Sequence, residues 1–465
     1  MAVSSIGVGS GLPLEELLNN LRNSENNALV LIQSKQINAE QRLSAYGTLK
    51  NALEELNKAG QALGKAETMG ALKTSVTGDS FTASSTSAAI PGKYNVVVNQ
   101  LATSQSLVAT RQSDRTATIG TGGVITFKTD SDAEPKTLDL TGKGTSLNDI
   151  VAAINGDPKL GINATVVNDG DTFQLVLTTA ATGAKAALTE ISVAGNDNLR
   201  DVMGFGAGAP PAPASGMQLT GPPAQNALIT VNGIEVKSQT NVVENVLDGV
   251  TLTLNKADAA DATGNSLSIT RDDASTTKAI NAFVTAYNSL QGTIKTLTSY
   301  NADAQKSSAL TGDSLARQMQ NQVRSVLNVS GESGDIRSLA QLGISTDPAT
   351  GLLKVDNDKL NAAVKNNLGD VQNLLGGENG LSKQLGAVTD AFNKSGGLIS
   401  AAQDGATKSA ADLKKQFDAT SERIEAKMAN YRAQFTALDS LVAQMNSTST
   451  YLTQQLSMLG NMNEK

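Results

Sequence analysis

Residues Ile424 to Leu459 read IEAKMANYRAQFTALDSLVAQMNSTSTYLTQQLSML, and this stretch decides the fold. Apolar or small side chains recur in it at alternating steps of four and three residues, the spacing of a coiled-coil seam. Phe417 and Ala410 extend the same phase toward the N-terminus. The sequence therefore predicts a long amphipathic helix at the C-terminal end. Its stripe consists of Ile424, Met428, Tyr431, Phe435, Leu438, Val442, Met445, Ser449, Leu452, Leu456 and Leu459.

A second long helix is predicted near the N-terminus. Pro13 can open it, and Glu15 and Glu16 lie in its first turn, where the helix dipole favours acidic side chains. We expect a break near Ser44–Gly47 and an end at about Ala66. Because no other segment offers a partner of matching length, the two terminal helices are predicted to pair. The N-terminal stripe is Leu14, Leu18, Leu21, Ala28, Ile32, Ala39, Tyr46, Leu49, Leu53, Leu56 and Leu63.

The two stripes differ in what can cover them. Leu49 to Leu63 fits an internal core as well as an interface between chains. For Val442 to Leu459 we expect burial against another chain, because one neighbouring helix cannot cover the whole stripe together with Leu441. Met1 to Gly11 is rich in Ser and Gly without a period, and we expect it to be mobile.

Composition excludes several kinds of chemistry. The chain has 465 residues, no His, Cys or Trp, and only 3% aromatic residues. It therefore lacks a side chain whose unperturbed pKa lies near neutrality, a thiolate nucleophile and a disulfide. The net charge of −7 argues against a nucleic-acid partner. No apolar run is long enough to predict a membrane partner. We expect a structural protein without cofactor or metal, and not an enzyme.

The middle of the chain, from about Leu72 to Thr270, has the pattern of strands and turns. Asn163–Val167 and Thr172–Thr178 flank an Asn-Asp-Gly-Asp turn and predict a hairpin. Ser146 is predicted to cap a short helix. The Pro/Gly/Ala-rich stretch Gly208–Pro223 predicts a linker between two β-rich domains.

Helical periodicity resumes at Ser275. A second helix is predicted at about Asp313–Asn328, and Leu342–Asp356 predicts a hairpin. A further helix is expected from Asp358 to about Leu375. The fold class is thus a multidomain α plus β protein, in which paired terminal helices and a helical stalk carry two inserted β-rich domains. The predicted domains are 1–42 with 425–465 (terminal coiled coil), 43–70 with 274–424 (stalk), 71–108 with 222–273 (β-rich) and 109–221 (outer β-rich).

The acidic motifs of the sequence do not predict a binding or catalytic site. Asp130, Asp132 and Glu134 resemble the start of a calcium loop, but the required glycine and the closing glutamate are missing. Asp356 and Asp358 are better explained as turn and helix-cap residues.

Several stretches resemble one protein family, the flagellar hook-associated protein 2 or filament cap proteins of bacteria. GTSLNDIVAAIN at Gly144–Asn155 is in addition similar to a short motif of flagellins and hook proteins. The resemblance is carried by SSIGVGSGLPLEELL at Ser4–Leu18, LSAYGTLKNALEELNKAGQAL at Leu43–Leu63, IPGKYNVVVNQLATSQ at Ile90–Gln105 and LGISTDPATGLLKVDNDKLNAAV at Leu342–Val364.

This resemblance implies an extracellular protein at the tip of the flagellar filament, exported through the flagellar type III channel without a cleaved signal peptide. Its members form a ring of a few subunits that promotes folding and insertion of flagellin. The implied partners are sister subunits, flagellin, the hook-associated junction proteins and an export chaperone at the C-terminal helix. The residues expected to make assembly or flagellin contacts are Leu14, Leu18, Leu21, Ile32, Tyr431, Phe435, Leu438, Val442, Met445, Leu452, Leu456 and Leu459.

Three alternatives stay open at this point. A flagellin or a hook–filament junction protein would also have paired terminal helices. An adhesin could bind mucin or other host glycans through the β-rich domains. A carboxylate-based glycan hydrolase would need two acidic side chains that converge in a pocket of the β region.

Overall fold

The computed structural model describes residues 6–130, 134–210, 215–260, 262–303 and 305–462, with the side chains of 459–462 left aside. Asp132 of the calcium-like motif and residues 1–5 of the expected mobile segment lie outside the described residues. The chain divides into two compact units, one formed by 1–69 with 276–465 and the other by 70–275. Each unit is described by itself.

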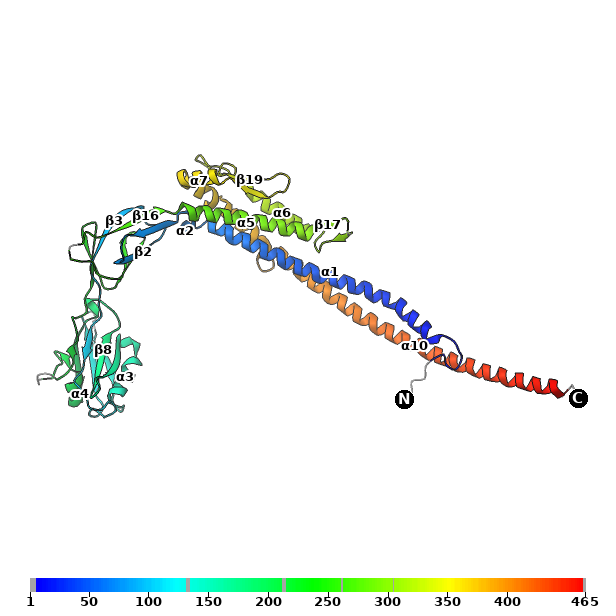
Figure 1. Ribbon diagram of the computed structural model, residues 1–465, viewed down its shortest axis with the longest axis horizontal. Helices are drawn as coiled ribbons and strands as arrows, with labels where there is room; N and C mark the ends of the chain where they lie inside the picture. The colour runs from blue at the N-terminus through cyan, green and yellow to red at the C-terminus, as the bar shows by residue number, and fades with distance from the viewer. Residues whose placement is uncertain (1–5, 131–133, 211–214, 261, 304, 463–465) are drawn as a thin grey trace. The chain divides into compact units, whose positions relative to one another are not determined.

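Two long helices dominate the first unit (Figure 1). Helix α1 runs from Leu14 to Leu63 and helix α10 from Leu398 to Met462, and they lie side by side. The predicted pairing of the terminal helices is therefore present. The predicted break at Ser44–Gly47 is wrong, because Ala45, Tyr46 and Leu49 are buried in the core and their packing outweighs the weak helix propensity of one glycine. Helix α1 ends at Leu63 rather than at Ala66, followed by the short helix α2 (Ala66–Met69).

A shared core joins α1 to the shorter helices. Leu49, Leu53, Leu56 and Leu63 are buried there, so the N-terminal stripe after residue 45 is internal core. The expected helix from Asp358 to Leu375 is two helices, because the backbone of Asn367 leaves the helical region. The helices of this core are α5 Asp273–Thr298, α6 Ser314–Ser325, η3 Val326–Asn328, α7 Asn357–Asn366, α8 Leu368–Gly376 and α9 Leu381–Asn393.

Two small antiparallel hairpins complete this unit. β17 (Tyr300–Asn301) pairs with β18 (Lys306–Ser307), and β19 (Ile344–Thr346) pairs with β20 (Leu353–Val355). The second is the hairpin predicted at Leu342–Asp356. The side-chain amide of Asn288 on α5 fixes it, since it donates to the Leu353 carbonyl at 2.9 Å and accepts from its N–H at 2.8 Å.

In the second unit, two antiparallel sheets enclose one apolar core that contains Phe81, Val96, Ile229, Leu252 and Leu267. Inward and outward residues alternate along their strands, as the period-two pattern of this region predicts. Across the first sheet the order is β1 Leu72–Val76, β16 Asn265–Arg271, β3 Gly92–Gln100, β12 Ala227–Val231 and β13 Ile234–Ser238. The second sheet contains β14 Val242–Leu247, β15 Val250–Leu254 and β2 Phe81–Ser85.

The same unit holds a second core between two four-stranded sheets and two helices. Ser146 caps α3 (Leu147–Asn155) in a capping box with Asp149, as predicted for Ser146. The other helical elements are η1 Pro158–Leu160, η2 Ala184–Ala186 and α4 Asp197–Met203. One sheet has the order β10 Phe205–Gly206, β9 Leu188–Ala194, β5 Val124–Thr129 and β6 Lys136–Asp139; the other has β11 Gln218–Leu219, β4 Ser106–Val108, β8 Phe173–Thr179 and β7 Ile162–Asn168.

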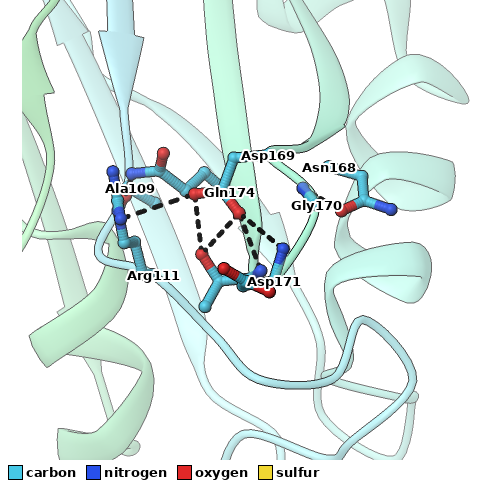
Figure 2. Close-up of polar contacts among 8 residues, drawn as sticks. Ala109, Arg111, Asn168, Asp169, Gly170, Asp171 and Gln174 are labelled. Atoms are coloured by element: carbon cyan, nitrogen blue, oxygen red, sulfur yellow. Dashed lines mark hydrogen bonds and ion pairs between the residues drawn. The ribbon is translucent and has the colours of Figure 1, made fainter.

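The hairpin predicted around residues 168–171 connects β7 to β8 (Figure 2). Asp169 accepts hydrogen bonds from the N–H of Thr172 at 2.7 Å and from its hydroxyl, and it pairs with Arg111 at 3.5 Å. These bonds hold the pKa of Asp169 below its ordinary value, the largest contribution coming from the backbone of Thr172. The carboxylate of Asp169 is thus occupied by the turn residue Thr172 and by Arg111, which gives the acidic loop a structural role.

Candidate assembly surface

Near the N-terminal end of α1, a small apolar cluster joins α1 to α10. We call this cluster the seam. Leu18, Ile424 and Met428 are buried in it, and Leu21, Leu29, Tyr431 and Phe435 are partly buried around them. The rings of Tyr431 and Phe435 stack with their centroids 6.4 Å apart. This cluster is small, so the pair depends less on apolar burial here than it does in the core beyond residue 45.

Ion pairs cross between the helices along the seam. Arg22 pairs with Glu425 at 3.4 Å, Arg432 pairs with Glu15 at 3.0 Å, and Lys427 pairs with Glu25. Glu15 lies opposite Arg432, whereas Gly47 lies near Gln403, which makes the two helices antiparallel. The side chains of each pair are largely exposed to solvent, which screens their attraction, so the pairs favour a register more than they add stability.

The pairing stops at the beginning of α1. Helix α1 starts at Leu14, and the loop before it contacts α10 at Asp439 and Ala443. From Ser440 onward α10 continues without a helix beside it in the described part of this unit, as Figure 1 shows at its red end. We call residues 440–462 the tail; at 1.5 Å per residue it is about 35 Å long.

The tail exposes a row of large apolar side chains. Leu441, Met445, Leu452 and Leu456 are each between 54% and 67% exposed. They line one face of the helix together with Thr448 and Ser449. The sequence contains no charged residue from Ser440 to Asn463. A partner can therefore bury this face without removing a charge from water, which would cost several kcal/mol.

The structure places some of the predicted contact residues in the seam and others on the tail. Leu14 and Leu18 are buried, and Leu21, Tyr431 and Phe435 pack in the seam, so these side chains are occupied within the chain. Ile32 is half-buried further along α1. Leu438, Val442, Met445, Leu452 and Leu456 lie toward or on the tail, with Val442 half-buried and the others exposed. The side chain of Leu459 lies outside the described residues.

Sequence reasoning missed Ser10 and Asp439, which join the loop before α1 to α10. The backbone N–H of Ser10 donates to Asp439 Oδ1 at 2.8 Å, and its hydroxyl donates to the same oxygen. Two signals were available: the alternating glycines of SSIGVGSGL, and the position of Asp439 as the last acidic residue before the charge-free tail.

No group of three or more His, Cys, Asp or Glu side chains that could hold a metal ion occurs among the described residues. None of the helices described is long and apolar enough to cross a membrane.

Comparison with known proteins gives the class first. The crystal structure of the flagellar cap protein FliD D1-D2-D3 domains from Escherichia coli aligns with a TM-score of 0.69 at 36% sequence identity, covering 78% of this chain and 99% of that one. Over the part of the chain that aligns, the fold is therefore that of a structural protein of the bacterial flagellum.

Sequence comparison then gives the family. Two family models match, "Flagellar hook-associated protein 2 N-terminus" at residues 10–105 and "Flagellar hook-associated protein 2 C-terminus" at residues 224–447. Flagellar hook-associated protein 2 of Escherichia coli K12 is 38% identical over 98% of each chain. The A-type protein of Pseudomonas aeruginosa is 30% identical over 99% of this chain and 98% of its own. The chain belongs to the flagellar hook-associated protein 2 family, as its resemblance predicted, and this decides against a flagellin or a junction protein.

Proposed function

We propose that the protein caps the distal end of the flagellar filament as a ring of a few identical subunits, with the tail of α10 as its main assembly surface. The observation that supports the tail most directly is its uncovered, charge-free apolar face. Relatives that match over the whole chain carry the name hook-associated protein 2, and a solved relative is described as a flagellar cap protein.

The physics of the tail favours association with another helix. Full burial of one Leu or Met side chain contributes about 1.5–3 kcal/mol, and the tail exposes four such side chains on one face. The four-three spacing of the seam continues through Met445, Leu452 and Leu456, so a partner helix can pack there as α1 packs on the seam. On the same face lie Thr448, Ser449 and Thr453, whose hydroxyl groups can form hydrogen bonds across an interface.

Further partners follow from the proposal. Flagellin would meet the ring from below during folding and insertion, junction proteins would precede it at the filament base, and an export chaperone would cover the tail before secretion. Export would use the flagellar type III channel without a cleaved signal peptide. Since the relatives are structural proteins and the sequence contains neither His nor Cys, we also propose that the protein has no catalytic activity.

We retain the four-part division of the chain as a proposal with one shift. Separate buried clusters around Leu18, Leu49, Phe81 and Leu107 support four parts. Strand β4, with Leu107, packs in the outer core, so the first crossing into the outer part is placed before β4 rather than at residue 108. Limited proteolysis of the full chain would test this, since cuts are expected near 103–105 and 221–226.

Size measurement tests the assembly surface. Light scattering on the purified chain is expected to show a closed oligomer of a few subunits. The double variant Leu452→Gln, Leu456→Gln should shift it to monomer and should fail to restore swimming in a strain that lacks its own cap protein. Gln454→Ala, at an exposed position of the same tail outside this apolar face, is the matched control and should assemble normally. Long filaments from the wild-type chain, or normal assembly of the double variant, would contradict the proposal.

A further inference from the structure

The glycine-rich loop before α1 is built around one carboxylate. Asp439 accepts from the backbone and the hydroxyl of Ser10, and the backbones of Gly7 and Gly9 also help to lower its pKa. The hydroxyl of Ser10 contributes most to the lowered pKa of Asp439. Several amides that converge on one anion form a nest, and hydrogen bonds to a charged acceptor are stronger than those between neutral groups.

The shape of the loop depends on its glycines. Gly7 has a φ of +98°, and a Cβ there would lie 2.2 Å from the carbonyl oxygen of Leu12. A Cβ at Gly9 would lie 3.1 Å from the Cβ of Ala443, so the loop backbone rests directly on α10. The N–H of Gly11 closes the loop on the carbonyl of Gly7 at 2.9 Å. Larger residues at positions 7 or 9 would force the loop away from Asp439.

This loop adds a polar tether at the start of α1, where Leu14 and Leu18 are also buried. Pro13 occupies the cap position, and its side chain cannot accept a hydrogen bond from the first turn. The remaining polar contact of this turn with α10 is the exposed ion pair of Glu15 with Arg432, which is worth little by itself. Asp439 is also the last charged residue before the charge-free tail. The loop therefore grips α10 where the internal pair ends and the tail begins.

We propose that residues Gly7–Ser10 form a clasp that grips Asp439, anchors the N-terminal end of α1 on α10, and so ends the contacts of α10 within the chain near Ala443, which leaves the apolar face from Met445 onward free for another chain. Its boundary role rests on the proposed assembly through the tail, whereas the clasp itself rests on contacts within one chain. An anchored end preorganises the surface beside the tail, which lowers the entropy cost of association. In this proposal Asp439 is a positioning residue and does not itself touch the partner.

Hydrogen exchange in the full-length chain tests the clasp. Asp439→Asn removes the charge but keeps the side-chain size, and amides of residues 7–10 should then exchange at least about fivefold faster. Asp418→Asn is the matched control, because Asp418 pairs only with Lys414 of its own helix among the contacts described and lies on α10. Unchanged exchange in Asp439→Asn would refute the clasp.

A pair of glycine variants gives an independent test. Gly7→Ala should speed exchange of the loop as Asp439→Asn does, because its Cβ collides with backbone. Gly11 also has a positive φ, +73°, but a Cβ there meets nothing within 4 Å, so Gly11→Ala should leave the loop bound to Asp439. Equal effects of the two variants would indicate general backbone strain and overturn the proposal.

The boundary role has its own readout. By sedimentation, Asp439→Asn should need at least about threefold more protein for half-assembly than wild type, while Asp418→Asn should not. Unchanged assembly together with a released loop would refute the boundary role. A wild-type chain that stays monomeric would instead refute the proposed function. Hydrogen exchange would still test the clasp, because the clasp lies within one chain.

Discussion

At the scale of single residues, Asp313 ties α1 to α6. It accepts from the Tyr46 hydroxyl at 2.7 Å and pairs with Arg42 at 2.9 Å, and both of these residues belong to α1. It also caps α6, since its side chain accepts from the Ala316 N–H at 3.0 Å. Burial raises the pKa of Asp313, but the hydrogen bond from Tyr46 and the other donors together bring it below its ordinary value. One carboxylate thus serves a tertiary contact and a helix terminus.

Removing these contacts should cost measurable stability. Tyr46→Phe leaves the carboxylate without one donor and should lower the free energy of unfolding by about 1–2 kcal/mol in urea titrations. Asp313→Ala should cost more, because it removes the helix cap as well. Tyr94→Phe is the control, because the Tyr94 hydroxyl makes an exposed bond to the Ile90 carbonyl, and it should cost less than about 0.5 kcal/mol. An Asp313→Ala variant as stable as wild type would contradict this role.

Asp347 predicts a pH dependence of stability. Lys354, together with the N–H groups of Thr350 and Ala349, lowers its pKa from 3.8 to about 2. A carboxylate whose folded pKa is depressed stabilises the fold above its unfolded pKa, and this contribution is lost as the pH falls from about 4 to 2. In urea titrations over this range, Asp347→Asn should therefore show a shallower loss of stability than wild type. Parallel curves would show that Asp347 is not linked to folding.

At this scale the sequence carries only indirect signs of the contacts that matter most. Ser10 and Asp439 are 429 positions apart, and neither belongs to a periodic pattern. Tyr46 was placed in the apolar stripe, yet its hydroxyl reaches Asp313, which the sequence marks only as the start of a helix. A local signal was reliable where Ser146 bonds its own neighbours as a helix cap, whereas α7 is capped by Asp356 rather than by Asp358, where its start was expected.

At the scale of elements, the long helices were predictable because their apolar period persists over many turns. Their interruptions were not. Gly47 lies inside a continuous helix, whereas the break between α7 and α8 falls at Asn367 without a glycine or proline at that position. Tertiary packing decides both cases, and a single sequence does not contain it. Strand β5 starts only at Val124, because Gly120, Gly122 and Gly123 just before it have positive φ values.

Two glycines of α1 give a matched test of this reasoning. A Cβ at Gly47 would meet only the end of Gln403, at 3.9 Å, so Gly47→Ala should raise the free energy of unfolding by about 0.5–1 kcal/mol. A Cβ at Gly60 would lie 2.4 Å from Leu385 Cδ2, a buried side chain, so Gly60→Ala should bring no gain or a loss. Thermal unfolding of both variants measures the difference. The interpretation fails if Gly60→Ala is the more stable one.

At the scale of the whole molecule, charge is divided unevenly along α10. The seam carries ion pairs with α1 at Glu425, Lys427 and Arg432, and the tail carries no charge at all. Ion pairs thus help to fix how α1 and α10 pair within the chain. The tail, which is left for other chains, offers only shape and apolar area for recognition. The sequence already showed this division, but without the start of α1 at Leu14 the two parts could not be told apart.

This division predicts how assembly responds to salt. Ion pairs between exposed groups are screened within about 10 Å at 0.1 M salt, whereas burial of apolar area is not weakened by added salt. The chain has a net charge of −7, so salt also reduces repulsion between copies. Assembly through the tail should therefore keep or gain strength between 0.05 and 0.5 M sodium chloride, as measured by the concentration of half-assembly in sedimentation. An interface built on ion pairs would instead weaken over this range, as would one between the charged faces of α1 and α10. The variant Leu452→Lys distinguishes an apolar interface through the tail from one built on ion pairs. It should reduce assembly strongly and make the remaining assembly sensitive to salt, because it brings like charges into the interface. A wild-type oligomer that dissociates as salt rises would rule out the tail as the principal contact.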